Sequence, residues 1–110
     1  MSTPNAEMQK MRKICPKAEL WQEGGQPAVF LPGLKVKHAG TTVPVDAILM
    51  PGYHSGYSTR LFLNRPFANR GQNWTTHSVA GTTWHAMSWN GVAASLGWDE
   101  ILAAHLGPLQ

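Results

Sequence analysis

Hydrophobic residues recur at helical spacing near both ends of the chain. Residues 4–15 predict a first helix, because apolar side chains fall on one face at intervals of three and four residues. These are Met8, Met11, Ile14 and Cys15. Pro4 suits the first position of a helix, and Pro16 ends it because the residue before a proline resists helical dihedral angles. A short helical continuation is expected over residues 17–22.

The middle of the chain changes to the alternating pattern of strands. Residues 28–37 predict a first strand that can bend at Pro32-Gly33, and residues 41–50 predict a second. The segment His38-Ala39-Gly40 is expected to join them as a hairpin turn. In the second strand, one face carries four small or branched apolar residues: Val43, Val45, Ala47 and Leu49.

The pattern is less regular toward the C-terminus. Residues 58–67 predict a third strand that stops at Pro66, and residues 75–89 predict a fourth strand followed by a structured loop. A last helix is expected over about residues 98–106, with acidic residues in its first turn and Gly107-Pro108 after its end. The order indicates an α+β fold, with helices packed on an antiparallel meander of three or four strands.

Composition narrows the range of functions. The length of 110 residues predicts a single domain that spans residues 1–110. The net charge of +3 is too small for the dense basic surface of a nucleic-acid-binding protein, so no nucleic-acid partner is expected. No apolar run reaches membrane-spanning length and no secretory leader is visible, so we expect a cytoplasmic protein with no membrane partner. The low charged fraction of 14% favours a protein partner.

Candidate chemistry gathers in the segment "TWHAMSWNG", residues 83–91. Here Ser88 stands between two tryptophans and close to His85 and Asn90. Either the segment is an aromatic core strand with an incidental hydroxyl, or it is a site shaped around a nucleophile. The five histidines show no pair at metal-ligand spacing and there is one cysteine, so no metal or cofactor is expected.

Three segments carry a resemblance to a known family. "VFLPGLKV" followed by "VDAILMPGY", then "LFLNRPF", then "TWHAMSWNG" with Trp98 ten residues after Ser88, are together similar to compact bacterial ubiquitin-conjugating (UBC-fold) proteins. The resemblance covers residues 28–106. It implies a UBC-like fold, with the active-site segment at about residues 84–97. The usual catalytic cysteine and the histidine-proline-asparagine tripeptide before it are missing, and Ser88 best matches the cysteine position.

The resemblance implies acyl transfer of a small protein. A ubiquitin-like protein would pass from an activating enzyme to Ser88 and be held there as an oxyester. The first helix would dock the activating enzyme, and its basic residues suit an acidic surface. These are Lys10, Arg12, Lys13 and Lys17. The alternatives are a non-catalytic UBC-fold scaffold that binds the same partners, and an unrelated small α+β binding module.

A serine nucleophile needs a base within hydrogen-bond reach. His85 can approach Ser88 if residues 85–88 form a turn or one helical step, whereas a regular strand puts His85 on the opposite face and leaves His77 as the base. The Asn90 amide could serve as an oxyanion donor, or Asn90-Gly91 could simply form a tight turn. Cys15 is the rival nucleophile, although a small buried contact fits its apolar helix face better.

Overall fold

The computed structural model describes residues 4–23, 25–38, 40–52, 58–65, 74–79, 81–87 and 92–107. Two helices and six strands lie within these ranges. They are α1 (Pro4–Ile14), β1 (Glu19–Glu23), β2 (Gln26–His38), β3 (Thr41–Met50), β4 (Arg60–Leu63), β5 (Trp74–Val79), β6 (Thr82–Met87) and α2 (Trp98–Leu106).

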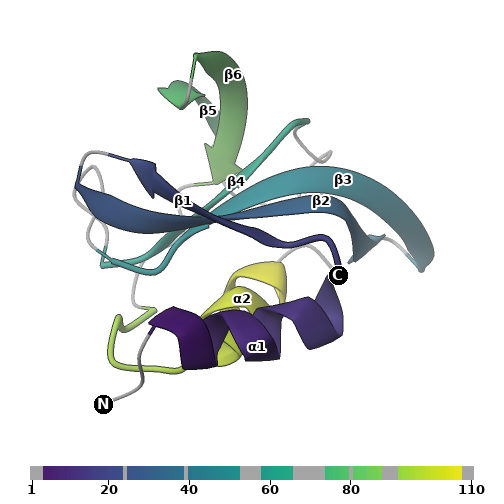
Figure 1. The fold of residues 1–110 in the computed structure, drawn as a ribbon. Coiled ribbons are helices and arrows are strands. Elements are labelled where there is room, and N and C mark those ends of the chain that lie inside the picture. Colours follow the sequence, from purple (N-terminus) through teal and green to yellow (C-terminus); the bar gives the residue numbers. More distant parts are fainter. Residues whose placement is uncertain are drawn as a thin grey trace.

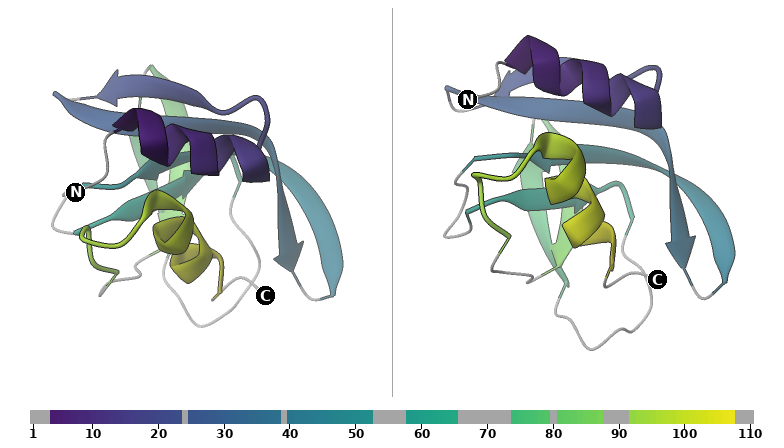
Figure 2. Two further views of the ribbon diagram at one scale, coloured as in Figure 1. Left: turned by 60° about the horizontal axis from the view of Figure 1, so that its bottom comes forward. Right: turned by 90° about the horizontal axis from the view of Figure 1, so that it is seen from below.

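The strands form one antiparallel sheet in the order β1-β2-β3-β4-β6-β5. Both helices lie across the same face of this sheet, which we call the helix face, and the β5–β6 hairpin rises on the other side, the outer face (Figure 1). The two views in Figure 2 show α1 and α2 against that one face, with the end of the β2–β3 hairpin extending past them. The predicted α+β class is confirmed, and the layout is consistent with a UBC-like one.

Two predicted elements differ from the structure. The helical continuation over residues 17–22 is wrong, because Glu19–Glu23 form β1 and pair with Gln26–Phe30. The sheet also has six strands instead of three or four, because the predicted fourth strand is a hairpin of β5 and β6. In both cases a glycine with positive φ, Gly25 at 80° and Gly81 at 79°, stands in the tight connection.

The larger core lies between the helices and the helix face. The predicted face of β3 is confirmed, since three of its residues are buried in this core and Val43 packs against it. Met8 and Met11 of α1 and Cys15 directly after it are buried as predicted, but Ile14 is 48% exposed. Ile14 is the last residue of α1, and its side chain lines a surface hollow beside β2 and does not enter the core.

A second apolar cluster lies on the outer face, and its ring contacts show that the sheet is curved. The Phe30 ring on β2 stacks on Trp21 at 4.5 Å and meets Trp84 of β6 edge-on at 6.3 Å. In a flat sheet, β2 and β6 would be about 14 Å apart, with β3 and β4 between them. The sheet must therefore curl toward its outer face, helped by the bulge between Leu31 and Leu34.

The carboxylate of Glu7 joins the two helices. Glu7 is only 3% exposed, and its Oε1 accepts a 2.8 Å hydrogen bond from the backbone N–H of Trp98, the first residue of α2. Lys10 Nζ lies 3.4 Å from the other oxygen, Oε2. The negative charge meets the positive end of the α2 dipole and satisfies an N–H that α2 itself cannot. A residue near the start of the chain thus fixes where α2 begins.

The Glu7→Ala substitution should lower the free energy of unfolding by about 2 kcal/mol, because it leaves the Trp98 N–H inside the protein without its acceptor. The matched control is Glu100→Ala, since the exposed Glu100 carboxylate accepts the neighbouring Gly97 N–H at 3.3 Å and faces water. Urea unfolding of both variants measures the difference. An equal loss in the two would contradict the role given to Glu7.

Candidate functional site

The strand β6 leads directly into the segment that carries the predicted nucleophile. It ends at Met87, and Ser88 and Asn90 lie outside the described residues. Residues 85–87 are extended, so a turn or helical step does not begin at His85 itself. A contact between the His85 ring and the Ser88 hydroxyl therefore requires the chain to bend back after Met87.

The two histidines proposed as bases lie on opposite faces of the β5–β6 hairpin. His77 is paired with Trp84, and Trp84 belongs to the outer-face cluster. His85 is paired with Leu63, which is part of the core on the helix face. Because directly paired residues of antiparallel strands share a face, His77 points to the outer face and His85 to the helix face. They cannot act on the same side of the hairpin.

His77 belongs to a polar cluster that the sequence did not predict. Its Nε2 lies 2.7 Å from Thr75 Oγ1, and its ring meets the buried Phe62 edge-on at 5.3 Å. Arg60, only 3% exposed, donates from Nη2 to the same Thr75 oxygen at 3.3 Å, with its guanidinium 5.7 Å from the centre of the Phe62 ring. In either tautomer, therefore, Nε2 of His77 is occupied by Thr75. The arginine directly before the apolar residues 61–63 of β4 is the feature of the sequence that could have indicated this cluster.

His85 is the less constrained of the two. It is half-buried on β6, opposite Thr76 on one side and Leu63 on the other. Within the described part of the chain, its ring makes no hydrogen bond. Of the two histidines, His85 is thus the one whose ring nitrogens are not already used by the surrounding sheet.

Four residues after Ser88, the chain is anchored at Val92. The buried Thr59 hydroxyl, just before β4, donates to the Val92 carbonyl at 2.9 Å and lies 2.9 Å from Nε2 of His105 on α2. Since the only Thr59 proton goes to Val92, His105 must donate from Nε2. The pKa of His105 is lowered to about 4, first by burial and then by the positive charge of Arg60. The sequence did not predict the polar partners of His105.

The four predicted docking residues divide into two pairs, and Lys17 lies in the turn after α1 and not on the helix as predicted. Lys10 is held by Glu7, and Arg12 donates from Nε to the Ala18 carbonyl at 3.4 Å, so both have partners inside the protein. Lys13 and Lys17 are exposed, and neither side chain contacts an acidic group among the described residues. The basic surface that α1 offers to a partner is thus centred near its C-terminal end.

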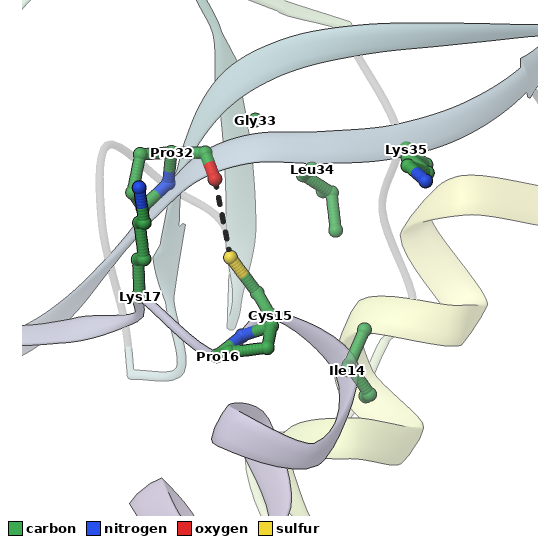
Figure 3. Close-up of a pocket in the computed structure, with 8 residues that line it drawn as sticks. All are labelled: Ile14, Cys15, Pro16, Lys17, Pro32, Gly33, Leu34 and Lys35. Atoms are coloured by element: carbon green, nitrogen blue, oxygen red, sulfur yellow. Dashed lines mark hydrogen bonds between the residues drawn. The ribbon is translucent and has the colours of Figure 1, made fainter.

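A hollow of about 360 Å³ opens at that same end, between α1 and the bulge of β2 (Figure 3). We call it the α1–β2 hollow; it is lined by Ile14, Cys15, Pro16, Lys17, Pro32, Gly33, Leu34 and Lys35. The Cys15 thiol donates to the Pro32 carbonyl at 3.3 Å, and burial raises its pKa. Cys15 is therefore a buried contact, and its thiol is poorly suited to act as a nucleophile.

Other kinds of site have little support. Within the described ranges, no three histidine, cysteine, aspartate or glutamate side chains are placed to share a metal ion. None of the helices described is long and apolar enough to cross a membrane. Comparison with family models, curated proteins and solved structures finds no match for this chain.

The buried His105 should make stability depend on pH. Its pKa of about 4 lies below the ordinary 6.5, so between these values the unfolded chain binds more protons than the folded one. The free energy of unfolding should fall as the pH drops from about 6.5 to about 4, by about 3 kcal/mol in all. Urea unfolding across this range should show a smaller fall in His105→Gln, whose amide can still donate to Thr59. Parallel pH curves for the two proteins would contradict the assignment.

Proposed function

We propose that this chain is a ubiquitin-conjugating-enzyme-like transferase that carries a ubiquitin-like protein as an oxyester on Ser88. The observation that carries the proposal is the position of the segment around Ser88. The strand β6 ends at Met87, directly before Ser88, and four residues after Ser88 the Val92 carbonyl is tied to Thr59, which also contacts His105 of α2. A nucleophile there would be held between two rigid parts of the fold, as acyl transfer requires.

The chemistry begins with a cargo already activated as a thioester on an activating enzyme. The Ser88 oxygen attacks the carbonyl carbon at the cargo's C-terminus, and His85 accepts the hydroxyl proton. The Asn90 amide donates to the oxyanion of the tetrahedral intermediate. The C–S bond then breaks, and the departing thiolate takes the proton from His85. Charge and protons balance in these steps, and no metal or cofactor takes part.

His85 is the preferred base because its ring is uncommitted among the described residues, whereas Nε2 of His77 is taken by Thr75. The proposal requires the chain to bend back after Met87, so that the Ser88 hydroxyl reaches the helix-face side of β6. The exposed Lys13 and Lys17 would dock an acidic surface of the activating enzyme, with long-range attraction raising the association rate.

A second candidate is the non-catalytic scaffold, which binds the ubiquitin-like protein or its activating enzyme without a covalent step. The placement of the histidines favours it. His77 is paired with Trp84, four residues before Ser88, so a strand continued past Met87 would put Ser88 about 13 Å from His77 along the hairpin. His85 would then be on the opposite face, and Ser88 would have no base.

Incubation with the cognate activating enzyme, ATP and the ubiquitin-like protein should give a covalent adduct. It should survive thiol reductants and be cleaved by hydroxylamine or mild base, because it is an oxyester. Ser88→Ala should abolish it, and Ser88→Cys should make it sensitive to reductant. Mass spectrometry and reducing gels measure both. Binding of the partners with no adduct in the wild type or in Ser88→Cys would establish the scaffold instead.

The two histidines can be separated by their effects on the rate. His85→Gln should slow oxyester formation by about a hundredfold or more, because general base catalysis contributes at least that much. His77→Gln should leave the rate within about twofold, since its amide can still bond Thr75. Single-turnover transfer assays measure these rates. A large loss in His77→Gln with none in His85→Gln would reverse the assignment of the base.

A further inference from the structure

Part of β2 has a free edge. The strand β1 pairs only with residues 26–30 of β2, whereas β3 pairs with the other side of β2 as far as His38. Before Glu19 the chain leaves the sheet, through a turn in which Ala18 N–H donates to the Cys15 carbonyl, and joins α1. No described strand therefore covers residues 34–37 on the β1 side. The α1–β2 hollow lies at the start of this free edge (Figure 3).

The register shows which backbone groups point to this edge. Lys35 is opposite Pro44, and a proline has no N–H to exchange with its partner. The pair must therefore be of the type that is not hydrogen-bonded, so Lys35 and, two residues on, Lys37 direct their N–H and C=O groups away from β3. These groups are presented at the spacing that an added strand would match.

The side chains along this edge are sorted by face. Leu34 and Val36 point to the helix face, where Leu34 and the exposed Ile14 line the α1–β2 hollow. Lys35 and Lys37 alternate with them and are exposed. Lys17 stands across the hollow from Lys35 in Figure 3. A strand placed here would meet the Lys35 and Lys37 cations on one face and, on the other, the apolar Ile14 and Leu34 side chains of the hollow.

We propose that the β2 edge and the α1–β2 hollow bind an extended acidic segment of a partner protein by strand addition. The segment alternates acidic and apolar residues. Its carboxylates pair with Lys35 and Lys37, and an apolar side chain enters the hollow beside Ile14. The acidic groups of the neighbouring strands do not compete for these lysines, because Glu19 accepts from the Trp21 indole and Asp46 accepts the Gly33 N–H. The inference is independent of Ser88 and of any conjugation reaction.

The other strand edges among the described residues fit this ligand less well. The outer edge of β1 carries the acidic Glu19, which repels a carboxylate-rich strand. The β5 edge carries threonine, serine and histidine and no lysine or arginine. Cations, an apolar hollow and unpaired backbone groups come together only at β2, within the part of the chain that the structure describes.

The test uses the full-length protein and an end-blocked, fluorescein-labelled peptide, Glu-Val-Glu-Leu-Glu-Val-Glu. Fluorescence anisotropy should show saturable binding that weakens with salt. The same peptide with lysine in place of glutamate should not bind. Lys35→Glu should weaken binding by about tenfold, whereas Lys13→Glu, of equal charge change but outside the hollow, should have a smaller effect. Ile14→Ala should also weaken binding without unfolding the protein, because Ile14 is exposed.

The backbone provides the decisive measurement. On peptide binding, the amide protons of Lys35 and Lys37 should exchange with solvent more slowly by about tenfold, as followed by NMR. Two peptides methylated on alternate backbone nitrogens should differ, one binding and the other not. Binding without protection at these two amides, protection along β1 or β5 instead, or no binding at about 1 mM peptide would each overturn the proposal.

Discussion

The buried Glu7 carboxylate is the contact on which the position of the candidate site depends. It ties the start of α1 to the first N–H of α2, 91 residues later in the chain. Asp99 and the exposed Glu100 also lie in the first turn of α2, but among the described residues only Glu7 brings a buried carboxylate to it, and the cost of burying that charge is offset by the Trp98 N–H and Lys10. Because α2 also holds His105, which reaches Thr59 and through it Val92, the same carboxylate sets where the segment after β6 rejoins the fold.

The curled sheet gives the molecule two apolar faces with different consequences. The helix face is closed by α1 and α2, whereas the outer-face cluster is closed by the sheet itself as β6 approaches β2. Arg60 and Phe62 are two residues apart on β4 and so share the outer face, where the Arg60 cation is stabilised by the Phe62 ring and the Thr75 hydroxyl. This cluster holds His77 in place through Thr75 and the edge-on contact with Phe62, whereas His85 on the other face has no such contacts among the described residues.

Periodicity predicted most of the elements, and the chemistry of the site only in part. The α1 helix, the bent β2 strand, β3 and α2 follow from local spacing, and their apolar faces are largely those expected. The identity of β1 could not be found that way, because residues 17–22 have no alternation of their own and become a strand only by pairing with β2. Likewise, the sequence shows both His77 and His85, but it does not show that they lie on opposite faces of the hairpin, because this depends on the register between β5 and β6.

The exit of the chain from the sheet links the two surfaces that we propose for partners. After α1, the chain passes through Pro16 and a turn to Ala18, and it joins the sheet only from Glu19 onward. Residues 34–37 of β2 are therefore left without a neighbouring described strand on that side. The same geometry exposes Ile14 and puts Lys17 beside the free edge. The docking surface that we propose near the end of α1 and the proposed strand-addition edge on β2 are therefore adjacent. One partner could then contact the end of α1 and pair with β2 at the same time, because Lys17 lies between the two surfaces.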